Sequence, residues 1–287
     1  MKKIFALLMT CMLLLATACG GGDKTSDQKK FKLGMITRLN ASEENFGEFI
    51  KKIEDTLDVK IYSHTPVFFD SLNQMQMALQ SGQINEISTY QSVARYMLAK
   101  DPHYAVLKDH SLEFIDSFCF ALREDDIELK DSLNKVINEM RDDGTLDKLT
   151  KQYITDFNAK NEPTAVDMPL FPNAGTIKVA VTGDLPPLDY VNAEGKPAGF
   201  NTAVLAEIGN RMSKNIELVD IDSGARAAAL ESKKVDVVFW AIVPVSEIIP
   251  SDSDKPAGVA LTDPYYKDKT VHLIYQDNPD KKSNDKK

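Results

Sequence analysis

The chain has 287 residues and a formal net charge of −9, because 43 acidic residues outnumber 34 basic ones. This balance excludes nucleic acid as an expected partner, since binding to the phosphate backbone requires a surplus of Lys and Arg. The chain has three cysteines, Cys11, Cys19 and Cys119. Cys11 lies in an N-terminal apolar run and Cys19 at its end, so Cys119 stands alone and we expect it to be buried without a disulfide.

The first residues have the pattern of a secretory signal. Residues 1–3 give a charged start, and Ile4–Ala18 is an apolar run broken only by Thr10 and Thr17. The run is shorter than the roughly 20 residues that a membrane-spanning helix needs. We therefore predict that residues 1–18 are a signal peptide and that the mature protein works outside the cytoplasm.

A cysteine directly follows this signal. The sequence Ala16-Thr17-Ala18-Cys19 resembles the lipobox of bacterial lipoproteins, although Ala16 stands where that motif usually carries Leu. The resemblance implies that a lipid on Cys19 anchors the protein to the membrane, with residues 19–30 as a flexible tether. The alternative is an ordinary signal peptidase site that happens to precede a cysteine.

Residues 31–157 alternate strand-like and helical patterns. Four short apolar runs predict strands, and two stretches with apolar residues at helical spacing predict helices. This alternation is typical of an α/β fold. The predicted strands are Phe31–Thr37, Val59–Tyr62, Ile84–Thr89 and Ser117–Leu122, and the helical stretches carry Leu72, Met75 and Leu79, then Leu133, Val136, Ile137 and Met140.

The α/β pattern is interrupted once and then resumes. Residues 158–175 contain three prolines and little periodicity, so we interpret them as a linker. Residues 176–277 resume the pattern, and the polar residues 278–287 are predicted to be a disordered tail. The second segment is predicted to hold strands Ile177–Thr182, Val235–Val243 and Val271–Tyr275 and a helix that buries Phe200, Val204, Leu205, Ile208 and Met212.

A weak repeat relates the two segments. Residues 78–87 (ALQSGQINEI) align with residues 229–238 (ALESKKVDVV). Each sequence has the pattern of a helix end, a tight polar turn and the start of a buried strand. Because the repeat occurs once in each segment, it favours two lobes of similar build.

The second segment also carries five motifs of a known family. In chain order they are IKVAVTGD, PPLDY, GKPAGFN, ALESKKVDVV and LTDPYY. They resemble the first lobe of the family-3 extracellular solute-binding proteins, the receptors of polar amino-acid ABC transporters. The motifs occupy residues 177–184, 186–190, 195–201, 229–238 and 261–266.

Residues 31–157 resemble the second lobe of the same family, with its closing helices at residues 129–153. The two resemblances imply an α/β, two-lobed fold of the type II periplasmic-binding-protein-like class, with a cleft between the lobes. The order of the lobes is reversed relative to the family, which implies a circular permutation in which residues 158–175 join the family's usual ends. The alternative is two independent half-receptors, one of them degenerate.

In such folds the solute lies between the lobes, at the carboxyl ends of strands. The loop that holds Asp184, Leu188 and Tyr190 follows a predicted strand and is stiffened by Pro186-Pro187. Tyr190 either forms an aromatic wall of the cleft or packs on its own lobe. The family often carries an aromatic residue where Leu188 stands, so the cation–π contact with an amino group is not expected at this place, and Phe239 or Trp240 is the candidate to replace it.

Three further residues of the second segment are candidates for the cleft. Arg226 begins an alanine-rich helix and either grips a carboxylate of the solute or forms a salt bridge to a nearby acid. Phe239 and Trp240 are adjacent on a predicted strand, so their side chains point in opposite directions. Both have the core as the default location, and we expect at least one of the two to line the cleft.

The opposite wall is predicted from the first segment. Thr37, Arg38 and Asn40 follow its first strand, where they form either an anion site or, for Asn40 with Glu43, the capping box of a helix. Tyr90 stands where the family usually carries the aspartate that binds an α-amino group.

The family's carboxylate-binding arginine also has no counterpart, because residues 241–250 contain no arginine. Both contacts for an ordinary amino acid are thus absent. The resemblance therefore implies a receptor for a small polar solute, an amino acid or a related organic acid or amine.

We predict from these patterns an extracytoplasmic, lipid-anchored and monomeric substrate-binding protein that serves an ABC permease. No catalytic residue, cofactor or metal is predicted, because the four histidines lie in unrelated segments. One alternative is a ligand-sensing module of a signalling receptor. The other is a periplasmic dehydratase-type enzyme on the same fold, for which Asp184 and Asp189 are acidic candidates.

Overall fold

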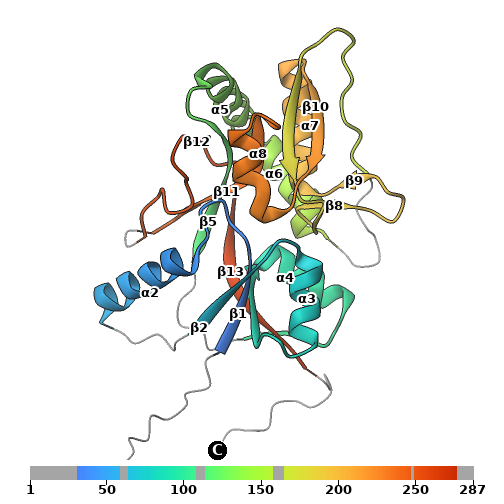
Figure 1. Ribbon diagram of the computed structural model, residues 1–287. Coiled ribbons are helices and arrows are strands. Elements are labelled where there is room, and N and C mark those ends of the chain that lie inside the picture. The colour runs from blue at the N-terminus through green and yellow to red at the C-terminus, as the bar shows by residue number, and fades with distance from the viewer. Residues whose placement is uncertain (1–30, 59–63, 108–113, 158–164, 247–248, 277–287) are drawn as a thin grey trace, which may run out of the picture. The chain divides into compact units, whose positions relative to one another are not determined.

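The computed structural model describes residues 31–58, 64–107, 114–157, 165–246 and 249–276 (Figure 1). The predicted signal peptide, Cys19 with its tether, the predicted strand Val59–Tyr62 and the tail lie outside these residues. No helix among the described residues is both long and apolar enough to cross a membrane.

The lower lobe in Figure 1 is built on a sheet whose first three strands are parallel. Strand β1 lies between β2 and β3, and β13 (Tyr266–Tyr275) pairs antiparallel with β3. Helices α3 and α4 bury Met75, Leu79, Val93 and Met97 in the core. The elements are β1 Phe31–Ile36, α2 Glu43–Leu57, β2 His64–Phe69, α3 Leu72–Gln80, β3 Glu86–Tyr90, α4 Gln91–Lys100 and β4 Tyr104–Val106.

The upper lobe has a similar parallel core. Strand β6 lies between β10 and β11 and is parallel to both. Strand β5 then pairs antiparallel with β11 and with the short β12. The elements are β5 Ile115–Arg123, α5 Ile127–Asp142, α6 Thr145–Thr150, β6 Thr176–Val181, α7 Phe200–Met212, β10 Asn215–Asp220, α8 Arg226–Glu231, β11 Val237–Pro244 and β12 Val259–Leu261, with a small sheet of β7 Asp184–Leu185, β8 Asp189–Val191 and β9 Pro197–Ala198.

Each segment of the chain contributes a strand to the other segment's sheet. Strand β5, from the first segment, pairs with β11 of the second. Strand β13, from the second segment, pairs with β5 over residues 266–269 and with β3 over residues 270–273. The two sheets are therefore joined through β5 and β13, and neither segment completes a lobe without the other.

Helices of the first segment also pack on the second segment. Helices α5 and α6 both contact α7. Arg211 of α7 forms an ion pair with Asp143 at 2.8 Å and donates a hydrogen bond to Thr145 Oγ1 at 3.0 Å. Residues 129–150 therefore belong to the upper lobe, although they precede its parallel strands in the chain.

The two copies of the sequence repeat form the same turn. In each, the chain leaves the helix through a residue of positive φ, Gly82 at 74° and Lys233 at 60°. Three residues later, an Asn or Asp makes two hydrogen bonds to one residue of the lobe's first strand, one to its N–H and one to its C=O. Asn85 accepts from Lys32 N–H through Oδ1 and donates to Lys32 O, both at 2.9 Å. Asp236 does the same with Lys178, at 3.0 and 2.8 Å.

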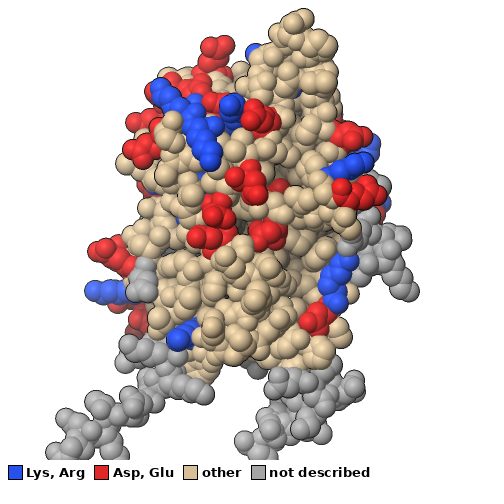
Figure 2. All heavy atoms as spheres, turned by 45° about the vertical axis from the view of Figure 1, so that its right-hand side comes forward, with Lys and Arg blue, Asp and Glu red and all other residues tan. Residues whose placement is uncertain are grey.

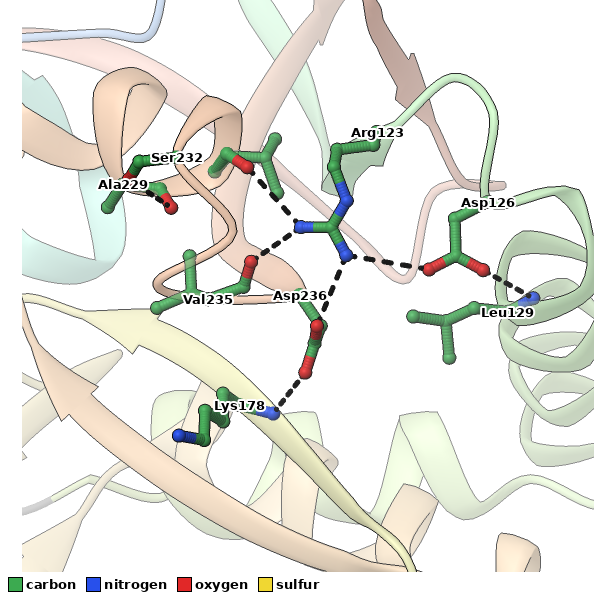
Figure 3. Close-up of polar contacts among 9 residues, drawn as sticks. Arg123, Asp126, Leu129, Lys178, Ala229, Ser232, Val235 and Asp236 are labelled. Atoms are coloured by element: carbon green, nitrogen blue, oxygen red, sulfur yellow. Dashed lines mark hydrogen bonds and ion pairs between the residues drawn. The ribbon is translucent and has the colours of Figure 1, made fainter.

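An arginine fixes this turn in the upper lobe (Figure 3). Arg123, the last residue of β5, donates to Val235 O at 2.6 Å and to Asp236 Oδ1 at 3.1 Å. Its ion pair with Asp126 measures 3.6 Å. The C-terminal end of β5 is thereby held to the turn between α8 and β11.

The positive φ of Gly82 gives a testable prediction. An alanine there meets no atom within 4 Å, so Gly82→Ala should cost only the backbone energy, about 1 kcal/mol of unfolding free energy. The matched control is Gly47→Ala in the exposed middle of α2, which also meets nothing within 4 Å and should stabilise by up to about 1 kcal/mol. Urea unfolding measures both, and equal effects of the same sign would contradict the assigned turn.

Candidate functional site

The two lobes meet through loops at the carboxyl ends of parallel strands. The lower lobe contributes the loops after β1, β2 and β3, and the upper lobe those after β6, β10 and β11. In α/β proteins this edge presents loops and the first turns of helices, which is where ligands bind. The interface between the lobes is therefore the candidate site.

Two carboxylates bridge the lobes by accepting backbone N–H groups. Asp70, after β2, accepts from Gly224 N–H at 2.9 Å. Asp184, in the upper lobe, accepts from the N–H of Leu72, the first residue of α3, at 2.8 Å. A Cβ atom on Gly224 would lie 2.6 Å from Asp70 Oδ1, so a side chain at this position would displace the Asp70 carboxylate from its hydrogen bond.

A third bridge involves Asn40 and the buried Asp254. Asp254 accepts from Asn40 N–H at 3.1 Å and from Ile242 N–H at 3.2 Å. The capping box predicted for Asn40 and Glu43 is wrong, because the N-cap of α2 is Ser42, whose hydroxyl accepts from Asn45 N–H at 3.0 Å. Asn40 is thus held by the opposite lobe.

Arg226 is fully buried where the lobes meet. Its guanidinium donates to three backbone carbonyls, those of Ser223 at 3.1 Å, Trp240 at 2.9 Å and Thr37 at 2.9 Å. The last of these bonds crosses from one lobe to the other. Burial lowers the pKa of Arg226 to about 10, so the side chain is still charged at neutral pH. In this arrangement Arg226 holds the backbones of both lobes and forms no ion pair with a carboxylate of the described residues.

A small cavity of about 20 Å³ lies between the lobes beside Trp240. Such a volume has room for roughly one water molecule, so a larger solute requires the lobes to move further apart. Of the residues predicted for the site, Arg38, Tyr90 and Trp240 line this cavity. The lining consists of Met35, Ile36, Arg38, Ser88, Thr89, Tyr90, Leu185, Trp240 and Thr270.

Asp116 connects two residues of the lining. It accepts from the Tyr90 hydroxyl at 2.9 Å and from the Arg38 guanidinium at 3.4 Å. Burial and the neighbouring carboxylate raise the pKa of Tyr90, so its hydroxyl stays a donor. Burial alone would lower the pKa of Arg38, but Tyr90, Asp116 and Asp254 together raise it above its usual value.

Aromatic rings form the floor of this region. The Tyr90 ring lies edge-on to Phe118 at 4.7 Å and to Trp240 at 5.8 Å between centroids. The Arg226 guanidinium lies over the Trp240 ring, 4.9 Å from its centroid. The Nε1 atom of Trp240 is buried and has no hydrogen-bond partner in the described part of the chain. It is therefore a spare donor in the lining of the cavity.

Other predicted residues lie away from this cavity. Leu188 and Phe239 are completely buried in the core of the upper lobe. Tyr190 is buried in β8, with its ring 6.1 Å from that of Tyr96 on α4. Asp189 accepts from Thr182 and Gly183 N–H, both at 2.8 Å, which fixes its own loop.

A second, larger cavity of about 190 Å³ lies at the outer edge of the interface. Asp184 and Pro186 line it from the upper lobe, and α3 and α4 line it from the lower lobe. Gln80 donates to the hydroxyl of Tyr104 at 3.1 Å within this lining. The remaining lining residues are Leu72, Asn73, Gln76, Tyr96, Met97, Lys100 and Asp101.

The sequence patterns did not identify three acids of the interface, Asp70, Asp116 and Asp254. Asp70 follows β2, whose His64–Phe69 sequence contains a proline and was not predicted as a strand. Asp116 lies within β5, next to apolar residues, and Asp254 lies in a turn without periodicity. A search for acids just after strands would have found Asp70 once β2 was known.

Comparison with known proteins finds a family model that matches the second segment. Residues 177–286 match the model of the bacterial extracellular solute-binding proteins, family 3. The resemblance that the sequence motifs predict is thereby confirmed for this segment.

One curated relative matches this chain over a number of residues similar to that of the family match. The lysine/arginine/ornithine-binding periplasmic protein of Escherichia coli (strain K12) is 33% identical over 106 residues, or 36% of this chain. The matching part spans only 38% of that relative's length.

Solved structures match most of the described chain at low identity. A nutrient-binding protein from Burkholderia cenocepacia, bound to methionine, is 12% identical and covers 88% of this chain and 87% of its own, with a TM-score of 0.38. The ligand-binding component of an ABC-type import system from Staphylococcus aureus is 13% identical, with coverages of 86% and 66% and a TM-score of 0.38.

The buried carboxylates give a prediction for the pH dependence of stability. Burial raises the pKa of Asp184 and Asp254 above the ordinary value of 3.8, despite their N–H donors. In the window between that value and the raised pKa, the folded protein binds more protons than the unfolded chain, so these groups add stability as the pH falls. Asp143 has the opposite effect below that window. Its hydrogen bonds to Thr145 and Arg211 lower its pKa to about 2, so the protein loses stability as the pH falls from 3.8 toward 2.

We therefore expect the free energy of unfolding to increase as the pH falls from neutral toward the ordinary value of 3.8, and Asp254→Asn to lose part of this gain. Urea unfolding across this pH range measures both. A wild-type stability that falls on acidification over this range would contradict the assignment of buried, raised carboxyl groups.

Proposed function

We propose that this chain is an extracytoplasmic substrate-binding protein, which captures a small polar solute between its lobes and delivers it to an ABC permease. The observation that carries the proposal is the interface, where strand-end loops of both lobes meet around a cavity lined by Arg38, Tyr90 and Trp240. The family match of residues 177–286 supports the same function. The matched relative is a binding protein by its name, which favours binding over catalysis.

Binding would work by hinge motion. Strands β5 and β13 connect the lobes, so bending there would separate the loops that now bridge the interface. The bridges of Asp70, Asp184 and Asp254 are hydrogen bonds to backbone groups that would break and reform as the lobes move. A solute that contacts both lobes would shift the population toward the closed form.

We also propose that the chain is a circular permutation of the family's usual order. The packing of α5 and α6 on α7 supports this proposal, as does the exchange of β5 and β13 between the sheets. Under the alternative of two independent half-receptors, each segment would carry its own complete sheet and closing helices.

The proposal for the cell envelope rests on the N-terminal sequence. The signal-like run of residues 1–18 and the lipobox-like Ala16–Cys19 support export and a lipid anchor on Cys19. Under this proposal Cys19→Ser releases the monomeric protein from membranes in a fractionation experiment. A variant that sediments with membranes like the parent would exclude Cys19 as the anchor.

A ligand screen tests the proposed function directly. A bound solute at 100 times its dissociation constant should raise the free energy of unfolding by about 2.7 kcal/mol, which a thermal-shift assay detects. Trp240 is the chain's sole tryptophan and is 3% exposed, so the same solute should change its emission. A solute that stabilises the protein without changing Trp240 emission would bind elsewhere, for instance in the 190 Å³ cavity. Small polar solutes that all leave stability unchanged would contradict the function.

A further inference from the structure

We infer that the solute of the interlobe cavity is a short aliphatic monocarboxylate without an amino group. This inference rests on the proposed function and names the class of solute for the same site. It follows from the chemistry of the lining, which offers spare hydrogen-bond donors, one positive charge and a few apolar contacts.

The lining contains one charged residue, Arg38, and no acid. A guanidinium carries five N–H donors, and in the described part of the chain Arg38 uses a single long hydrogen bond, to Asp116 at 3.4 Å. Its side chain is 28% exposed, so donors remain accessible at the cavity. A carboxylate matches such a planar donor group in geometry and charge.

A second spare donor lies in the same lining. Trp240 Nε1 is buried without a partner in the described chain, and an indole N–H can only donate. A buried donor left without an acceptor destabilises the fold, so a solute oxygen that reached Nε1 would remove this penalty. Both spare donors call for the same kind of group, an anionic acceptor.

An amino group of a solute finds no matching partner in this lining. The nearby acids, Asp116 and Asp254, are not part of it and are almost fully buried, at 3% and 4% exposure. The Trp240 ring already carries the Arg226 guanidinium, which takes the place of a cation–π contact. Figure 2 shows acidic side chains gathered over the middle of one face of the molecule, but none of the lining residues is acidic. An ammonium group would therefore find hydroxyl oxygens in this lining but no carboxylate to balance its charge.

The rest of the lining limits the size and polarity of the solute. Met35, Ile36 and Leu185 are apolar, and the hydroxyl groups belong to Ser88, Thr89 and Thr270 besides Tyr90. A second carboxylate would meet no second cation in the lining. The volume of about 20 Å³ has room for about one water molecule, so even a short solute enters only when the lobes move apart, and each added group requires further opening. These features together select a short chain with one carboxylate and, at most, a small polar substituent.

The matched pair L-lactate and L-alanine tests the inference, because the two solutes differ in a hydroxyl against an ammonium group, and propionate serves as the unsubstituted acid. Isothermal titration calorimetry and Trp240 emission are followed for the purified protein. We expect lactate or propionate to bind at least about tenfold more tightly than alanine. Arg38→Gln should weaken that binding at least about tenfold, since a charged hydrogen bond is lost. The control Arg141→Gln, at an exposed residue of α5, should leave it unchanged.

Trp240→Phe keeps an aromatic ring but removes the N–H, and should also weaken carboxylate binding in calorimetry. Thermal unfolding checks that each variant is folded, and Arg38→Lys replaces Arg38→Gln if the latter is not. Alanine binding as tightly as lactate, or carboxylate binding that survives both Arg38→Gln and Trp240→Phe, overturns the solute class while the binding function stands. If no solute of any class changes Trp240 emission or stability, the proposed function itself fails.

Discussion

The described structure depends on the pairing of two long strands, β5 and β13. Each comes from one segment of the chain and completes the sheet of the other, and they pair with each other over residues 115–118 and 266–269. Phe118 and Cys119 at this crossing are completely buried, the latter as a free cysteine, as expected from the sequence. The two strands connect both sheets, so the lobes are joined there by continuous backbone pairing, which is consistent with the proposed hinge.

At the opposite edge, the lobes are held by polar contacts to backbone groups as well as by aromatic contacts such as that of Tyr90 with Trp240. Arg226 donates to carbonyls of both lobes, and three carboxylates accept N–H groups across the interface. Hydrogen bonds of this kind contribute about 1.5–3 kcal/mol each when a charge takes part, and water can replace them if the lobes separate.

Much of the fold could be predicted from the sequence, because apolar periodicity reports burial directly. The strand predictions that fall on described residues agree with β1, β3, β5, β6, β11 and β13, and the helices with α3, α5 and α7. Strand β2 was not predicted, because Pro66 and two polar residues interrupt its apolar pattern. A proline is tolerated there because β2 is an edge strand of the sheet.

The site was less predictable. Arg38, Tyr90 and Trp240 were predicted for the cleft and line the interlobe cavity. No sequence pattern can tell whether Arg226 faces a solute or three carbonyls, since that depends on the loops of the other segment.

The central claim, that both segments close one interface around a solute, is tested most directly by hydrogen exchange at the amides of Leu72 and Gly224, which donate across it. The account predicts that a bound solute slows exchange at both amides together. Exchange that is unchanged at both, with the solute bound, would contradict it.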